Sequence, residues 1–99
     1  MAAAFCGLDE DALAEQLGRY RAVGRGSALV ARDARRVVVD VGPAVPGGLV
    51  DELVVVERGC CPFFELRWAP PARRLTVAVR DAAHEPALSA IAAALAPVA

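Results

Sequence analysis

Apolar side chains recur at helical spacing near the start of the chain. Leu13, Leu17 and Tyr20 stand at positions i, i+4 and i+7, a spacing typical of an amphipathic helix. Asp9 has the side chain of a good N-cap, and two glycines follow the apolar stripe as stop signals. The pattern therefore predicts a helix from about Asp9 to Val23.

Two short runs with strand character follow this helix. Residues 27–32 and 36–41 are separated by the polar connection Asp33-Ala34-Arg35, which favours an antiparallel hairpin. In the second run valine occupies every second position, so one face of that strand is wholly apolar. These valines are Val37, Val39 and Val41.

The segment from Pro46 to Gly59 carries signals for both helix and strand. Leu49, Leu53 and Val56 have helical spacing, whereas the β-branched run 54–56 would also suit a strand. Proline is well tolerated in the first turn of a helix, and an arginine followed by a glycine suits its end. We therefore predict a helix here.

A second hairpin and a third helix complete the pattern. Apolar and polar residues alternate in 64–68 and again in 75–79, on either side of a Pro70-Pro71 turn. Pro86 then precedes an apolar stripe at helical spacing, which predicts a short terminal helix. The stripe consists of Leu88, Ile91 and Leu95.

The order of these elements predicts a single α+β domain spanning residues 1–99. Helices and strands follow one another as α-ββ-α-ββ-α, and the economical arrangement is a four-stranded, mostly antiparallel sheet with the helices on one face. The opposite face would be polar enough for water and flat enough to support a homodimer. It would carry Val38, Glu65, Arg67, Thr76 and Ala78.

Composition and charge narrow the class of protein. The 99 residues contain no apolar run near the roughly 20 residues that span a bilayer. The net charge is -1, and the 11 basic residues, all arginine, are spread among 12 acidic ones, unlike the basic stripe of a nucleic-acid-binding protein. The first residues lack the basic segment of a secretory signal, so the expected location is the cytoplasm. In that reducing compartment three cysteines, an odd number, favour free thiols or metal ligands over disulfides.

The segment from Glu57 to Phe64 holds the residues best suited to unusual chemistry. Cys60 and Cys61 are adjacent at the predicted junction of a helix and a strand, and Pro62 prevents the helix from continuing. Thiolates are soft ligands that select Cu(I), Zn(II) and, by the same polarisability, Hg(II) or trivalent arsenic. A third thiolate from Cys6 would complete a trigonal site if the fold brings the chain start near Cys60.

Other polar residues could influence these thiols. Glu57 precedes Cys60 by three positions, so its carboxylate is a candidate ligand, a candidate proton acceptor or simply a solvated helix residue. The charge of Arg58 would lower thiol pKa values, whereas a helix C-terminus would raise them. His84, the only histidine, is expected to cap the last helix or to lie in solvent, with metal ligation a lesser alternative.

Three functions stay open from the residues alone. The first, which we favour, is a module that binds a soft metal or metalloid ion through the cysteines. The second is a redox centre in which Cys60 and Cys61 form a disulfide or act as nucleophile and resolving thiol. The third is an interaction protein that dimerises through the mixed sheet face and buries its cysteines as small apolar side chains. No residue arrangement supports a hydrolase and no glycine-rich stretch matches a phosphate-binding loop, so an enzyme is disfavoured.

Several motifs together also carry a family resemblance. They are Cys6-Gly7-Leu8 before the first helix, Arg19 to Arg21 in it, Leu53, the stretch Glu57 to Phe63, and the Phe-x-Leu strand that follows. With them the chain resembles small, mostly uncharacterised bacterial proteins with an E-x-x-C-C-P-F motif, some of which accompany mercury-resistance regulators of the MerR type. The resemblance implies thiol-based handling of mercury or a similar soft ion, with Cys6, Cys60 and Cys61 as candidate ligands. The chain lacks the helix-turn-helix of such regulators, so a regulatory role would need a partner.

Overall fold

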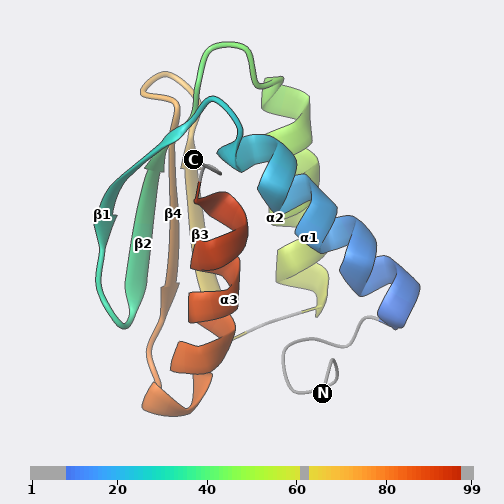
Figure 1. Cartoon of the computed structure of the whole chain (residues 1–99), viewed down its shortest axis with the longest axis vertical. Helices are drawn as coiled ribbons and strands as arrows, with labels where there is room; N and C mark the ends of the chain where they lie inside the picture. Colours follow the sequence, from blue (N-terminus) through green and yellow to red (C-terminus); the bar gives the residue numbers. More distant parts are fainter. Residues whose placement is uncertain (1–8, 61–62, 97–99) are drawn as a thin grey trace.

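The computed structural model describes residues 9–60 and 63–96, and in this part of the chain Figure 1 shows helices beside a four-stranded sheet. The predicted α+β class and the order α-ββ-α-ββ-α are confirmed. The elements are α1 (Glu10–Gly24), β1 (Ala28–Arg32), β2 (Arg36–Asp40), α2 (Gly47–Cys60), β3 (Phe64–Ala69), β4 (Arg74–Val79), the short 3-10 turn η2 (Ala82–His84) and α3 (Glu85–Leu95).

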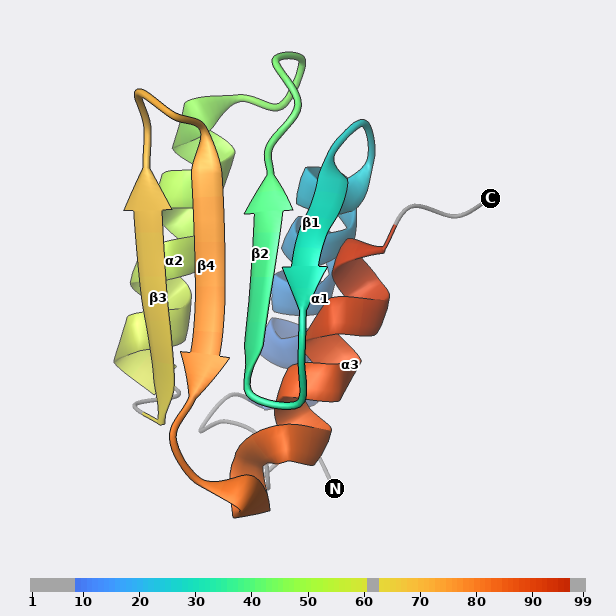
Figure 2. The ribbon, with the colours of Figure 1, turned by 90° about the vertical axis from the view of Figure 1, so that its left-hand side faces the viewer.

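The sheet joins the two predicted hairpins side by side. Its strand order is β1-β2-β4-β3, and each neighbouring pair is antiparallel. β2 and β3 therefore run parallel with β4 between them, and α2 connects one to the other, as in a split β-α-β unit. Figure 2 shows the helices behind one face of the sheet, and none of the described helices lies over the other face. The predicted one-sided packing is confirmed.

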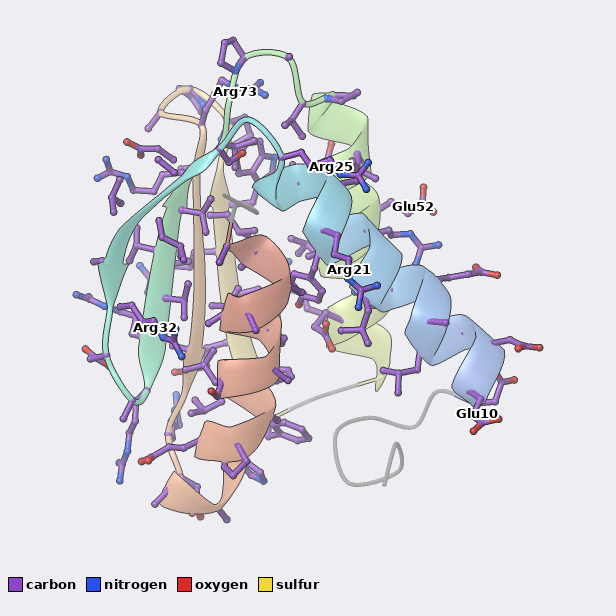
Figure 3. The ribbon with its side chains drawn as sticks, in the orientation of Figure 1. Glu10, Arg21, Arg25, Arg32, Glu52 and Arg73 are labelled. Atoms are coloured by element: carbon purple, nitrogen blue, oxygen red, sulfur yellow. The ribbon has the colours of Figure 1, made fainter. Side chains whose placement is uncertain are left out.

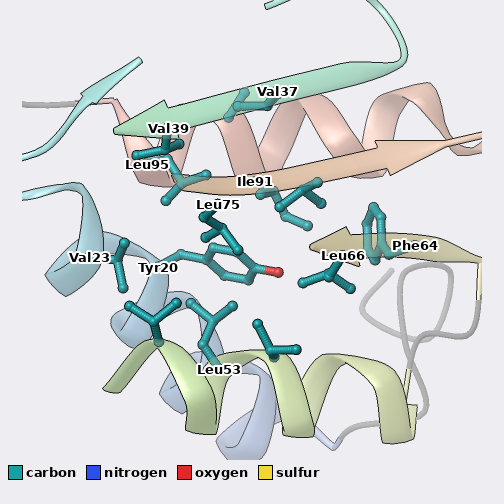
Figure 4. Close-up of a cluster of buried hydrophobic side chains, with 14 of the residues drawn as sticks. Tyr20, Val23, Val37, Val39, Leu53, Phe64, Leu66, Leu75, Ile91 and Leu95 are labelled. Carbon is teal, nitrogen blue, oxygen red and sulfur yellow. The ribbon is translucent and has the colours of Figure 1, made fainter. Parts of the chain in front are cut away.

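Alternation along the strands places one set of side chains in the core. Val37 and Val39 of β2 stand opposite Val77 and Leu75 of β4, and all four side chains are at most 1% exposed. Figure 4 shows Tyr20 of α1 reaching into the centre of this apolar cluster. The hydroxyl group of Tyr20 therefore lies where water is excluded and needs a partner from the protein.

The first helix forms where the pattern predicts, but its buried face is rotated from the predicted stripe. Asp9 is the N-cap, and its carboxylate accepts a hydrogen bond from the backbone N–H of Ala12 at 2.8 Å. Leu13 and Leu17 are only half-buried. The fully buried side chains of the helix instead belong to Gln16, Tyr20 and Val23. The difference arises because Gln16 finds hydrogen-bond partners inside the protein, which the sequence pattern does not reveal.

The ambiguous middle segment is a helix, as predicted. Its buried residues Val50, Leu53 and Val54 form a stripe that packs on the sheet and on α1, and this burial outweighs the strand preference of the valine run. The helix continues through Gly59 and ends at Cys60. The third helix has Pro86 in its first turn, and the predicted stripe of Leu88, Ile91 and Leu95 is buried.

The uncovered sheet face carries the residues predicted for it. Val38, Thr76 and Ala78 are half-buried there, and Glu65 and Arg67 are exposed. Within residues 9–60 and 63–96, none of the helices combines the length and the apolar character needed to cross a bilayer.

Candidate functional site

The predicted cysteine pair falls at the end of α2. Cys60 is the last residue of the helix and β3 begins at Phe64, so the predicted junction between helix and strand is confirmed. Cys6 and Cys61, together with the side chain of Cys60, lie outside the described residues. The convergence of the three sulfur atoms stays a prediction. The described side chains around the end of α2 make up the candidate site.

Glu57 is buried in the last turns of α2. Its side chain is 3% exposed, so a solvated helix residue, one of the roles considered for it, is ruled out. The hydroxyl of Tyr20 donates a hydrogen bond to Glu57 Oε1 at 2.5 Å, and Gln16 Nε2 donates to the same oxygen at 3.2 Å. Two side chains of α1 thus hold the carboxylate from across the helix pair.

Further bonds fix the orientation of Gln16. Its Nε2 also donates to the carbonyl oxygen of Leu53 at 2.9 Å, and its Oε1 accepts from Arg19 Nη1 at 2.9 Å. Arg19 in turn forms an ion pair with Glu52, with 2.9 Å between Nη2 and Oε1. Because the amide oxygen of Gln16 faces a cation, its nitrogen must face Glu57. The network therefore presents only neutral donors to the buried carboxylate.

The environment of Glu57 also acts on Tyr20. Burial of the phenol, the negative charge of Glu57 and the hydrogen bond between them raise the pKa of Tyr20 far above its usual value. The hydroxyl keeps its proton throughout the physiological range and remains a permanent donor to Glu57.

The partners across this network also define how the two helices run. Arg19 contacts Glu52, while Gln16, one turn earlier in α1, contacts Glu57, more than one turn later in α2. The helices are therefore antiparallel neighbours, and the first turn of α1 lies at the same end of the molecule as the last turn of α2, as Figure 1 shows. Asp9, the first described residue, therefore lies at the end of the molecule where Cys60 ends α2, and Cys6 precedes it by three positions in the sequence.

His84 was predicted to cap the last helix or to lie in solvent, and its half-buried side chain does neither. It occupies the N-cap position of α3, but its side chain makes no capping hydrogen bond. The imidazole instead stacks on the ring of Phe63, with 4.1 Å between centroids and 17° between planes. Phe63 follows Pro62 in sequence, so the only histidine lies beside the end of the cysteine motif. A hollow of about 400 Å³ adjoins the two rings, bordered also by Glu65, Arg80 and Asp81.

Arg58 lies next to the cysteines in sequence but is bound to the sheet. Its Nη2 donates to the carbonyl oxygen of Leu66 on β3 at 2.8 Å, and the side chain is exposed. Water around an exposed guanidinium screens its charge, which weakens the predicted effect of Arg58 on the neighbouring thiols.

Sequence reasoning missed Gln16 and assigned Tyr20 to the core alone. Gln16 and Tyr20 are four residues apart on one face of α1, and Glu57 continues the buried stripe of α2. A buried polar side chain needs a hydrogen-bond partner, so Gln16 on the buried face of α1 and Glu57 on the buried face of α2 could have been predicted to contact each other.

Comparison with known proteins gives no indication of the function of this chain. No family model matches the chain, and no curated protein or solved structure is significantly similar to it. Among the residues that the structure describes, no cluster of three or more histidine, cysteine, aspartate or glutamate side chains is arranged to hold a metal ion. Cys6, Cys61 and the side chain of Cys60 lie outside these residues.

Proposed function

We propose that this protein binds a soft metal or metalloid ion, of the class Hg(II), trivalent arsenic, Cu(I) or Zn(II), through the thiolates of Cys60 and Cys61. Cys6 supplies a third thiolate, and Glu57 assists from the preceding turn of the helix. One observation carries the proposal: a buried carboxylate, held by Tyr20 and Gln16, lies one turn before Cys60.

The charge of Glu57 supports a cation site at this helix end. A buried carboxylate is costly unless a cation or a set of donors compensates it, and its donors here are a phenol and an amide. Arg19, the nearest guanidinium in the network, binds Gln16 and Glu52. The C-terminal end of α2 adds its own partial negative charge. The resulting negative field favours a bound cation.

The same negative field favours metal capture over redox chemistry at the thiols. A redox nucleophile needs a thiol with a depressed pKa, whereas a negative field disfavours ionised thiols in the absence of a cation. A soft metal ion displaces the thiol protons as it binds, and a nearby carboxylate can accept one of them. This environment therefore suits capture of an ion better than formation of a nucleophile.

The placement of the helices allows a third sulfur ligand. Three residue steps join Cys6 to Asp9, a reach of at most about 11 Å for an extended chain. Because α1 begins at the end where α2 finishes, this reach is compatible with a site near Cys60. The resemblance carried by the stretch Glu57 to Phe63 points to the same class of ligand.

Titration of the reduced protein with each ion tests the proposal. We expect stoichiometric binding with a sulfur charge-transfer band in the near ultraviolet. Cys60→Ser and Cys61→Ser should each abolish the band, and Cys6→Ser should weaken it, while circular dichroism shows the fold intact. Binding that is unchanged in both Cys60→Ser and Cys61→Ser would remove the proposal.

Two further measurements separate the alternatives. Glu57→Gln should retain the bond from Tyr20 but lower metal affinity about tenfold, equivalent to about 1.4 kcal/mol. Asp51→Asn removes an exposed carboxylate of the same helix that takes no part in the network around Glu57, and it should leave the affinity unchanged. The rate of thiol alkylation against pH tests the redox reading, because an apparent pKa near the free value of about 8.5 argues against an activated nucleophile.

A further inference from the structure

The uncovered face of the sheet contains a hollow that the proposed thiol site does not use. Its volume is about 540 Å³, and three arginines from three different elements border it: Arg36 on β2, Arg58 on α2 and Arg67 on β3. Glu65 also borders it, as do Thr76 and Ala78 of β4 and the apolar residues Phe64 and Leu66 of β3. Figure 2 shows this face of the sheet, which no helix covers.

Strand register explains why the hollow forms between the arginines. Arg36 stands opposite Ala78, and Thr76 stands opposite Arg67, so only small side chains of β4 separate the two arginines. Two strand spacings of about 4.8 Å and one two-residue step of about 6.7 Å put their Cα atoms about 12 Å apart. An arginine side chain spans about half that distance, so both guanidinium groups can reach a ligand seated on β4.

The acidic side chains on this face are already paired. Glu65 forms an ion pair with Arg80 at 2.7 Å, and Asp40 forms one with Arg74 at 2.9 Å. Within the described part of the chain, the side chains of Arg36 and Arg67 form neither a hydrogen bond nor an ion pair. Arg58 uses one nitrogen on the carbonyl of Leu66 and has further N–H groups. The hollow therefore carries an excess of positive charge.

We propose that this hollow binds a small dianion, either a phosphate group or a dicarboxylate. The planar guanidinium fork matches the two oxygens of a carboxylate or phosphate, and arginine is the residue that most often provides this geometry. A volume of about 540 Å³ accommodates a small organic anion.

Two other occupants suit the surface less well. None of the side chains that the strands place on the open face is aromatic, and Phe64, which also borders the hollow, is only 6% exposed, so a nucleobase would find little ring surface to stack on. A second copy of the same face would bring further unpaired arginines against these, and like charges facing one another disfavour association.

NMR titration of the reduced protein at low salt tests the site, with inorganic phosphate and succinate as the two probes. We expect saturable shifts of the backbone amides of Thr76 and Ala78 and of the Nε–H groups of Arg36 and Arg67. The probe with the lower Kd distinguishes a phosphate site from a dicarboxylate site. Arg36→Ala and Arg67→Ala should each raise the Kd about tenfold without changing the melting temperature.

Arg21→Ala is the matched control. Arg21 is exposed on α1, on the helix side of the molecule (Figure 3), and its loss changes the net charge by the same amount. It should leave the Kd within about twofold of the wild type. Cys60→Ser should also bind the anion normally, which keeps this result separate from metal binding. Shifts that do not saturate with either probe, or an equal loss in Arg21→Ala, would overturn the proposal.

Discussion

A single arginine ties two loops together at one end of the sheet. Arg73 lies in the turn between β3 and β4, and its Nη2 donates to the carbonyl oxygens of Gly42 at 2.9 Å and Val45 at 2.5 Å in the loop before α2. Its guanidinium also lies 5.9 Å from the centroid of the Trp68 ring. The backbone of Arg73 has a φ of 50°, in the left-handed region that non-glycine residues seldom adopt. The side-chain bonds offset the cost of that conformation.

We therefore expect Arg73→Ala to lower the free energy of unfolding by about 2 kcal/mol, because the charge-assisted hydrogen bonds from its guanidinium to the carbonyl groups of Gly42 and Val45 are lost. The adjacent Arg74 is the matched control. It forms an exposed ion pair with Asp40, and such pairs contribute about 0 to 1 kcal/mol. Urea unfolding of both variants checks the difference; equal losses would show that Arg73 contributes only as a surface charge.

Single residues also mark where sequence reasoning reached its limit. The helical spacing around Tyr20 predicts the helix correctly but not its buried face: Leu13 and Leu17 are only half-buried, whereas Gln16, which the pattern gives no reason to bury, is buried. Its reason lies 37 and 41 residues away, in the carbonyl of Leu53 and the carboxylate of Glu57. A pattern within one helix carries no information about a partner on another helix, so the network around Glu57 could be found only from the fold.

The close contact between α1 and α3 requires a glycine at position 24. Gly24 is the last residue of α1, and a Cβ atom built there would lie 2.3 Å from the carbonyl oxygen of Leu95 in α3. The obstacle is backbone, which cannot rotate away. Gly24 was predicted as a stop signal, and the structure gives it a second role in close helix packing.

Gly24→Ala should accordingly destabilise the protein by about 1 to 3 kcal/mol, because the two helices must move apart and loosen the core. Gly18 is the control in the same helix, since a Cβ there would meet no atom within 4 Å. Gly18→Ala should stabilise by about 0.5 to 1 kcal/mol through helix propensity. The midpoints of urea unfolding should therefore shift in opposite directions, and a shift of the same sign in both variants would contradict the packing argument.

The sequence predicted the helices and strands better than it predicted individual contacts. β2, β3 and β4 carry apolar residues at every second position, so the pattern already indicates which face of each strand meets the one-sided core. β1 lacks such alternation, and its pairing with β2 shifts register between Leu29 and Ala31. The middle segment was harder to predict because its β-branched run 54–56 favours a strand while the spacing of Leu49, Leu53 and Val56 favours a helix. The spacing predicted the helix correctly. The buried faces of α1 and α2 are the exceptions, since Leu13 and Leu17 of α1 and Leu49 and Val56 of α2 are only half-buried.

The whole molecule has an unusual titration behaviour at high pH. It contains one tyrosine and no lysine, so above about pH 10 Tyr20 is the main side chain left to ionise, since arginine keeps its proton beyond pH 12. The folded protein holds the proton of Tyr20 because its pKa is raised by burial and by Glu57. The unfolded chain releases that proton near pH 10. The unfolded state therefore binds fewer protons than the folded state in this range.

That difference sets the sign of the pH dependence. The free energy of unfolding should fall by about 1.4 kcal/mol for each pH unit above about 10, because alkaline conditions favour the state that has lost the proton. Urea unfolding is best measured in a variant with Cys6, Cys60 and Cys61 replaced by serine, so that thiol ionisation near pH 8.5 does not contribute. Tyr20→Phe in that background should begin less stable, since Glu57 loses one of its two donors, but its stability should then stay flat across the same range. An equal slope with and without the phenol would mean that another group controls alkaline unfolding and that Tyr20 is less shielded than its contacts with Glu57 imply.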